Sequence, residues 1–227
     1  MNILVLGKGK TGSLVAEIAQ HRGHMVRAVD EFDNVNGKAL TRDALKDVDV
    51  VIDFTAPQAV LENIANCVRH EGNMVVGTTG WYDRIPQVRH LVEEAGTGFV
   101  FGANFSIGVN LFFDIARAVA PALNLGYTGH IVERHHVTKL DKPSGTAIAI
   151  RNELQSKSSK VLEIESVRES DVVGDHSIRL ESENDVIELA HSAKSRRGFA
   201  EGAVRAAEWI DGKTGFYDFK DVWRKLK

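Results

Sequence analysis

The N-terminal part of the chain alternates short apolar runs with longer segments whose apolar residues recur at helical spacing. Residues 2–6, NILVL, form a run that ends at Gly7 and is typical of a strand buried on both faces. Residues 11–23 follow, with apolar side chains on one helical face and a glycine at the end. Strands that alternate with helices predict an α/β fold with a Rossmann-like, doubly wound parallel sheet. Further strands are expected at 24–30, 49–54, 73–80 and 98–104, and further helices at 42–47, 58–72 and 82–96.

The pattern changes after Asn104. Residues 106–123 form a long apolar segment that predicts a helix, and residues 126–137 predict a strand. Residues 160–193 show short apolar runs with polar interruptions and no helical segment between them, which is typical of a mostly antiparallel sheet. With a helix that begins near Ser144, these segments predict a second, smaller α+β domain joined to the first through short hinges.

Composition narrows the class of protein. The chain has 227 residues, 43% of them hydrophobic, and a formal net charge of -3, which disfavours broad nucleic-acid binding. The single cysteine, Cys67, allows no intrachain disulfide and is expected to be a packing residue. The N-terminus has no charged leader, and no apolar run approaches the roughly 20 residues of a membrane span. We therefore expect a cytoplasmic protein without membrane or nucleic-acid partners.

A glycine motif directly follows the first expected strand. Gly7, Gly9 and Gly12 stand in G-x-G-x-x-G order at the opening of the next helix. Such glycines permit a tight turn, close approach of the backbone to a pyrophosphate, and close packing of helix against strand. An ordinary turn is the alternative, but the strand and helix on either side favour nucleotide binding. The predicted loop comprises Gly7, Lys8, Gly9, Lys10, Thr11 and Gly12.

The expected cofactor is a nicotinamide dinucleotide, NADH or NADPH. Asp30 ends the second expected strand, close to the position where an acidic residue holds the adenosine ribose. A carboxylate there accepts hydrogen bonds from the ribose hydroxyls and repels a 2′-phosphate, so Asp30 mildly favours NADH. The adjacent Glu31 is an alternative for this role.

Small and hydroxylated residues follow the third and fourth expected strands, in the segments 53–57 and 77–80. In an open parallel sheet, ligands bind outside the carboxyl ends of the strands, and threonines can approach a cofactor closely. The predicted cofactor-binding set at these strand ends comprises Phe54, Thr55, Gly77, Thr78, Thr79, Asn104 and Phe105.

The segment 133–147, ERHHVTKLDKPSGTA, concentrates cations and hydrogen-bond donors. His135 and His136 are neighbours on an expected strand, so their side chains should face opposite sides and serve different purposes. Ser144 is a candidate N-cap, and a helix start at Gly145 and Thr146 attracts anions, as Lys139 does. These residues predict a site for an anionic small molecule. A metal is not expected, because no third ligand group shows clear spacing nearby.

This segment closely resembles the E-x-H-H-x-x-K-x-D-x-P-S-G-T-A signature of the dihydrodipicolinate reductase family. The motifs GTTG, GANFSIGVN and GFYDFKDV follow in family order, so the resemblance covers nearly the whole chain. It implies hydride transfer from NADH or NADPH to a cyclic unsaturated dicarboxylate, giving tetrahydrodipicolinate in lysine and diaminopimelate biosynthesis. By this match, His135 is the general acid and Lys139 is the second catalytic or substrate-binding cation. His136, Ser144, Gly145 and Thr146 correspond to positions that hold the substrate carboxylates.

The resemblance also implies the architecture. Residues 1–104 and 199–227 would form the dinucleotide-binding domain, and residues 105–198 the substrate-binding and oligomerisation domain of a homotetramer. Closure about hinges near Asn104 and Arg197 would bring hydride donor and acceptor together.

Three features depart from the family pattern. The nucleotide loop is one residue shorter than the usual G-x-x-G-R-M-G and lacks its arginine, so Lys8 or Lys10 could contact phosphate instead. Lys142 stands where an alanine is usual, and we assign it no role. The region 33–41 is also short. Two other functions compete: another two-domain dehydrogenase acting on amino or imino acids, and a non-catalytic nucleotide sensor. The histidine–lysine signature disfavours the first, and the family resemblance disfavours both.

Overall fold

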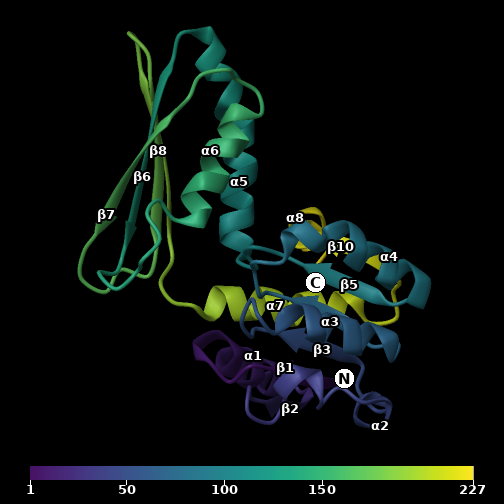
Figure 1. Cartoon of the computed structure of the whole chain (residues 1–227). Helices are drawn as coiled ribbons and strands as arrows, with labels where there is room; N and C mark the ends of the chain where they lie inside the picture. The colour runs from purple at the N-terminus through teal and green to yellow at the C-terminus, as the bar shows by residue number, and fades with distance from the viewer. Residues whose placement is uncertain (227) are drawn as a thin grey trace. The chain divides into compact units, whose positions relative to one another are not determined.

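The computed structural model describes residues 1–226, and the chain divides into two compact units (Figure 1). Unit 1 comprises Met1–Ile107 and Arg197–Lys227, and unit 2 comprises Gly108–Arg196.

Unit 1 contains a six-stranded parallel sheet in the order β10-β5-β4-β3-β1-β2 (Figure 1). The chain builds outward from β1 in both directions, with β2 on one side and β3 on the other, which confirms the doubly wound fold predicted from the sequence. The strands are β1 (Asn2–Leu6), β2 (Met25–Val29), β3 (Val50–Asp53), β4 (Asn73–Val76), β5 (Gly98–Phe101) and β10 (Gly215–Asp218).

Helices cover both faces of this sheet. Successive side chains of β1 enter different hydrophobic cores, since Ile3 lies in one core and Leu4 in the other. The first core also holds side chains of α1 (Lys10–His21) and α7 (Arg197–Ile210), and the second holds those of α3 (Val60–Arg69) and α4 (Ile85–Ala95). This is why the strand sequences are apolar without alternation. The short helices of unit 1 are α2 (Arg42–Leu45), α8 (Phe219–Val222) and the 3₁₀ turns at Val35–Gly37, Tyr82–Arg84 and Trp223–Lys225.

Two details of unit 1 bear on the sequence predictions. Strand β10 was not expected, because its sequence GFYD lacks the continuous apolar run of β3, β4 and β5 and only Phe216 is buried, so the strand is specified by its long-range pairing with β5. Cys67 is fully buried in the second core, and burial raises the pKa of its thiol to about 12, as expected of a packing residue.

Unit 2 is a four-stranded sheet in the order β7-β6-β8-β9, with helices on one face (Figure 1). Strands β6 and β7 pair in parallel, while β6 with β8 and β8 with β9 pair antiparallel, so the sheet is mostly antiparallel as predicted. Its core joins α5 and α6 to alternate residues of the strands, such as Ile131 and Ile178. The elements are α5 (Ile107–Val119), the 3₁₀ helix Ala120–Leu125, β6 (Thr128–His135), α6 (Gly145–Gln155), β7 (Glu163–Arg168), β8 (Asp175–Glu181) and β9 (Val186–Ser192).

The expected strand 126–137 was too long at both ends, since β6 ends at His135. His136 begins a turn, in which the Lys139 amide donates to the His136 carbonyl at 3.1 Å. His136 therefore lies outside the sheet, and its different environment comes from this turn rather than from the predicted strand alternation.

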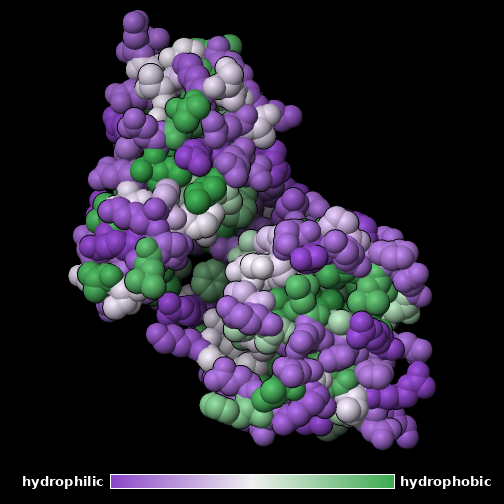
Figure 2. Space-filling model, in the orientation of Figure 1, coloured by the Kyte–Doolittle hydropathy of each residue, from purple (hydrophilic) through white to green (hydrophobic). Residues whose placement is uncertain are grey.

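On the face seen in Figure 2, hydrophilic side chains predominate and hydrophobic ones form scattered groups. Among the described residues, no helix combines the length and the apolar character that crossing a membrane requires.

Candidate active site

The nucleotide loop lies between β1 and α1, and its three glycines meet different surroundings. Gly7 has a φ of +93°, and a Cβ there would lie 2.3 Å from the Phe54 carbonyl oxygen. A Cβ at Gly12 would lie 1.9 Å from the Gly7 carbonyl oxygen, so both positions require glycine for packing. A Cβ at Gly9, the N-cap of α1, would meet nothing within 4 Å. Gly9 therefore leaves open space at the positive end of a helix, where a pyrophosphate fits.

The end of β2 brings two of the predicted cofactor residues together. Asp30 Oδ1 accepts hydrogen bonds from the amides of Phe32 and Asp33 at 3.0 and 3.1 Å, and Lys8 Nζ lies 3.5 Å from Asp30 Oδ2. The Asp33 amide, together with Lys8, lowers the pKa of Asp30 and keeps it ionised. The adjacent Glu31 is exposed. An ionised carboxylate at Asp30, with a lysine beside it, fits an adenosine ribose.

The ends of β3 and β4 share a buried carboxylate, Asp53. Its oxygens accept hydrogen bonds from the hydroxyls of Thr78 and Thr55 at 2.6 and 2.8 Å and from the Asn63 amide group at 2.8 Å. Burial raises the pKa of Asp53, and these donors oppose the rise. The side chains of Thr55 and Thr78 thus point inward and fix their loops by hydrogen bonds to Asp53, whereas Thr79 is exposed and available to a ligand.

Aromatic packing positions the remaining predicted cofactor residues. A Cβ at Gly77 would lie 2.2 Å from the Phe54 ring, and the Phe54 ring meets Phe105 edge-on at 6.1 Å. Asn104 Oδ1 accepts a hydrogen bond from the Ser106 amide at 2.9 Å, which fixes the turn after β5.

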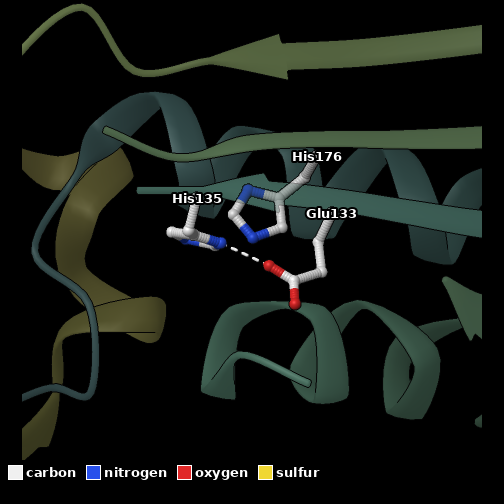
Figure 3. A group of neighbouring side chains, drawn as sticks. All are labelled: Glu133, His135 and His176. Atoms are coloured by element: carbon white, nitrogen blue, oxygen red, sulfur yellow. Dashed lines mark hydrogen bonds and ion pairs between the residues drawn. The ribbon is translucent and has the colours of Figure 1, made fainter. Parts of the chain in front are cut away.

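In unit 2, a second group of charged and polar side chains surrounds His135 (Figure 3). Glu133 and His135 lie two residues apart on β6 and face the same side, with exposures of 0% and 7%. Figure 3 shows the His135 ring pointing its Nδ1 at the Glu133 carboxylate, with the ring of His176 from β8 beside both. His176 stands directly opposite Glu133 in the β6–β8 register, and its ring centroid is 5.2 Å from that of His135.

The Glu133 carboxylate is held by three donors. Oε2 pairs with His135 Nδ1, while Oε1 lies 2.9 Å from Arg168 Nη2 and 3.3 Å from the Ser144 amide nitrogen. Burial alone would raise the pKa of Glu133, but the hydrogen bonds, led by Arg168, lower it. Glu133 is therefore an ionised, fully buried acceptor.

The two buried histidines are driven toward the neutral form. Burial lowers the pKa of His135, and Glu133 opposes this while the cations Lys139 and Arg168 add to it. Burial and the neighbouring His135 lower the pKa of His176 to about 4. His176 Nε2 lies 3.3 Å from Ser144 Oγ. His135 is thus the one of the two that a bound anion can readily return to the protonated state.

The turn after β6 carries the predicted cation. Lys139 Nζ bonds Asp141 Oδ1 at 2.7 Å, and His136 Nδ1 lies 2.8 Å from Thr138 Oγ1. Arg168 spans this turn as well, donating to the Asp141 carbonyl at 2.5 Å and to the Lys139 carbonyl at 3.4 Å. The same guanidinium therefore fixes both the partner of His135 and the loop that bears Lys139.

The start of α6 lies against the same group. Ser144 is the N-cap, and its hydroxyl accepts a hydrogen bond from the Ala147 amide at 3.2 Å, as predicted for a capping serine. A Cβ at Gly145 would meet nothing within 4 Å, so there is space beside this glycine at the positive end of the helix. Lys142 precedes this start and is exposed.

Sequence reasoning missed Glu133, Arg168 and His176. The two-residue spacing on one strand could have identified Glu133, whereas Arg168 and His176 reach the site only through the pairing of β6 with β7 and β8. The premise that no third ligand group lies near the histidines was wrong, since ligand atoms of Glu133, His135 and His176 lie within 4.8 Å of one another. Both Glu133 oxygens are already engaged, and Arg168 and Lys139 make the surroundings positive. These charges favour an anion over a metal ion, and the absence of a metal stays a prediction.

A dinucleotide-type glycine loop on a doubly wound sheet, with a buried histidine–carboxylate cluster in a second unit, is typical of a two-unit nicotinamide-dependent oxidoreductase. Residues 1–105 match the family described as "Dihydrodipicolinate reductase, N-terminus", and residues 108–223 match "Dihydrodipicolinate reductase, C-terminus". The chain belongs to the dihydrodipicolinate reductase family.

Individual relatives agree with this assignment. The chain is 37% identical to a 4-hydroxy-tetrahydrodipicolinate reductase of Christiangramia forsetii over 242 aligned positions, which cover 100% of this chain and 99% of that protein. It is 41% identical to the protein of the same name from Neisseria meningitidis serogroup B, over 77% of this chain and 72% of that protein. The fold resembles a solved dihydrodipicolinate reductase from Paenisporosarcina sp. TG-14, described as dipicolinate-bound, with a TM-score of 0.82 and 22% identity over 98% of this chain and 99% of that chain.

Proposed function

We propose that this enzyme reduces 4-hydroxy-tetrahydrodipicolinate to tetrahydrodipicolinate with NADH or NADPH, in lysine and diaminopimelate biosynthesis. The observation that carries the proposal is the buried His135, paired with the Glu133 carboxylate, in a chain whose two halves both match the family. Loss of water from the substrate leaves a conjugated cyclic dicarboxylate. Transfer of one hydride and one proton then reduces one double bond, and the cofactor departs oxidised. A different dehydrogenase and a nucleotide sensor, the alternatives from the sequence, both predict no turnover of this substrate.

His135 is the proposed general acid. Its pKa lies below its ordinary value in the free enzyme, chiefly because of burial. A dicarboxylate bound nearby adds negative charge and favours the protonated ring, so the acid is formed when the substrate is present. Lys139, 24% exposed at its side chain, is the proposed cationic partner of the substrate. His136, Ser144, Gly145 and Thr146 are proposed to hold the two carboxylates, with the amides of the α6 start as donors.

Unit 1 is proposed to bind the cofactor, whose nicotinamide supplies the hydride. The glycine loop would hold the pyrophosphate beside Gly9, and Asp30 would accept hydrogen bonds from the ribose. Because this carboxylate is ionised, NADH is the proposed preferred cofactor, with Lys8 available to a 2′-phosphate when NADPH binds. A cytoplasmic homotetramer remains the proposed form of the enzyme.

The test follows NADH and NADPH oxidation with substrate freshly formed from pyruvate and aspartate semialdehyde. Wild-type enzyme should oxidise the cofactor only when the substrate is present. No substrate-dependent oxidation with either cofactor would refute the proposal.

Two variants test the residue roles. His135→Gln should lower kcat by about 100-fold or more, the usual contribution of a general acid. Lys139→Ala should lower kcat/KM by about 10- to 100-fold, because it loses a charge-assisted hydrogen bond worth about 1.5–3 kcal/mol. Both variants should bind NADH as the wild type does, since the two substituted residues lie in unit 2 and the cofactor is proposed to bind unit 1. His90→Gln, at an exposed histidine of α4, is the matched control, and unchanged kcat in His135→Gln would remove the acid role.

A further inference from the structure

Glu133 occupies an unusual position for a carboxylate. It has no exposed surface, and a buried carboxylate without partners is strongly unfavourable. Here both oxygens are engaged, one by His135 Nδ1 and the other by Arg168 and the Ser144 amide. Two of these donors come from elements distant in sequence, β7 and the start of α6. The carboxylate can therefore neither rotate nor leave His135 without breaking a second buried contact.

This arrangement decides which nitrogen of His135 carries the exchangeable proton. An ionised carboxylate can only accept hydrogen bonds, so Nδ1 must be the donor to Glu133. In the neutral ring Nε2 is then unprotonated, and it is the atom that gains and releases a proton. Gly174 lies beside it, since a Cβ on that residue would come within 3.0 Å of His135 Nε2. The missing side chain leaves room at the reactive nitrogen.

We propose that Glu133 is a positioning residue that fixes the orientation and tautomer of His135, with Arg168 holding Glu133 in place. The inference deepens the proposed function and rests on His135 being the proton donor. The negative charge of Glu133 also stabilises the imidazolium form of His135 when the anionic substrate binds. Arg168 links this pair to the Lys139 loop through its bonds to the Lys139 and Asp141 carbonyls. The guanidinium of Arg168 thus fixes the positions of both the proposed proton donor, His135, and the loop that carries Lys139.

A purely structural ion pair is the competing explanation, and pH dependence separates the two. His135 must be protonated to donate, so kcat falls as the pH rises past the pKa of His135 in the substrate complex. Glu133→Gln keeps the shape of the side chain but removes the charge that favours the imidazolium. Its high-pH limb should therefore move to lower pH, with a loss of kcat that grows to about tenfold or more at high pH. A structural defect would lower kcat equally at every pH.

Matched variants complete the kinetic test. Glu133→Asp retains the charge, so its high-pH limb should stay where the wild-type limb lies even if kcat is reduced. Glu94→Gln removes an exposed carboxylate paired with His90 at 3.3 Å and should leave both kcat and the pH profile unchanged. An unshifted limb in Glu133→Gln would overturn the proposal.

The tautomer can be measured without turnover. In ¹⁵N-histidine-labelled wild-type enzyme, the His135 resonance is assigned by its loss in His135→Gln, and neutral His135 should carry its proton on Nδ1. A proton on Nε2 would overturn the proposal, even if Glu133→Gln failed to fold. Failure of the proposed function is a different result: wild-type enzyme would then show no substrate-dependent oxidation, while the tautomer measurement would still stand.

Discussion

His176 should make the stability of the enzyme depend on pH, by an amount that follows from its environment. It is 5% exposed, and burial with the neighbouring His135 lowers its pKa to about 4, against roughly 6.5 in an unfolded chain. Between these values the unfolded chain binds a proton that the folded chain excludes. The stability contributed by neutral His176 is therefore fully present above about pH 6.5 and is lost as the pH falls toward 4. Over the whole interval this amounts to about 3 kcal/mol, of which about 2 kcal/mol is lost between pH 7 and pH 5.

The perturbation is His176→Gln, which removes the titrating ring but keeps a polar group near Ser144. The assay is urea unfolding at pH 7 and pH 5, followed by far-UV circular dichroism. Tryptophan fluorescence would be blind to unit 2, because Trp81, Trp209 and Trp223 all lie in unit 1. The variant should be less stable than wild type at pH 7 but should lose about 2 kcal/mol less on going to pH 5.

The control for this experiment is His90→Gln, at an exposed histidine of α4, which should follow the wild-type curve. Glu133 and other carboxylates with lowered pKa values lose their contribution at lower pH, so they leave this window largely undisturbed. If His176→Gln and wild-type enzyme lost the same free energy between the two pH values, within about 0.5 kcal/mol, the buried neutral histidine would be ruled out.

Two further predictions concern unit 1. Asp30→Asn keeps the acceptor for the Phe32 and Asp33 amides but removes the charge, so in binding titrations it should weaken the binding of NADH and favour that of NADPH. Glu31→Gln should change neither affinity, and the reverse pattern would assign the ribose contact to Glu31. Thr78→Val removes a donor to buried Asp53 and should lower the free energy of unfolding by about 1.5–3 kcal/mol in urea titrations. Thr79→Val, at the exposed neighbour, should leave stability within about 0.5 kcal/mol, and equal losses in the two would show that Thr78 is not the buried partner.

The parallel sheet of unit 1 was predictable because each of its first five strands carries its own signal. Residues such as Ile3 and Leu4 are buried on opposite faces, which requires an uninterrupted apolar run that is visible locally. Strand β10, GFYD, has one buried residue and no apolar run, and it forms by pairing with β5, so no local pattern reveals it. Similarly, Thr55 and Thr78 were correctly placed at the strand ends, but their inward hydrogen bonds depend on Asp53 and Asn63.

The candidate site divides in the same way. His135, Lys139 and Ser144 lie within one short segment and were identified together from the sequence. Their partners Arg168 and His176 come from neighbouring strands, and only the register His135↔Arg168 and Glu133↔His176 brings them in. Residue types in a motif therefore predicted which side chains gather at the site, whereas their proton states depend on sheet pairing.

The charges of the site show what substrate binding must change. Arg168 is committed to Glu133 and to backbone carbonyls, so it cannot turn to a ligand without releasing the partner of His135. Among the described residues, Lys139 forms its ion pair with Asp141, whose side chain is 56% exposed and whose pairing is therefore weak. The proposed dianionic substrate would compete with Asp141 for Lys139 far more readily than with Glu133 for Arg168. Substrate binding should thus break the exposed Lys139–Asp141 pair and leave the buried Arg168–Glu133 pair intact. Lys139 could then move to the substrate while His135 keeps its orientation.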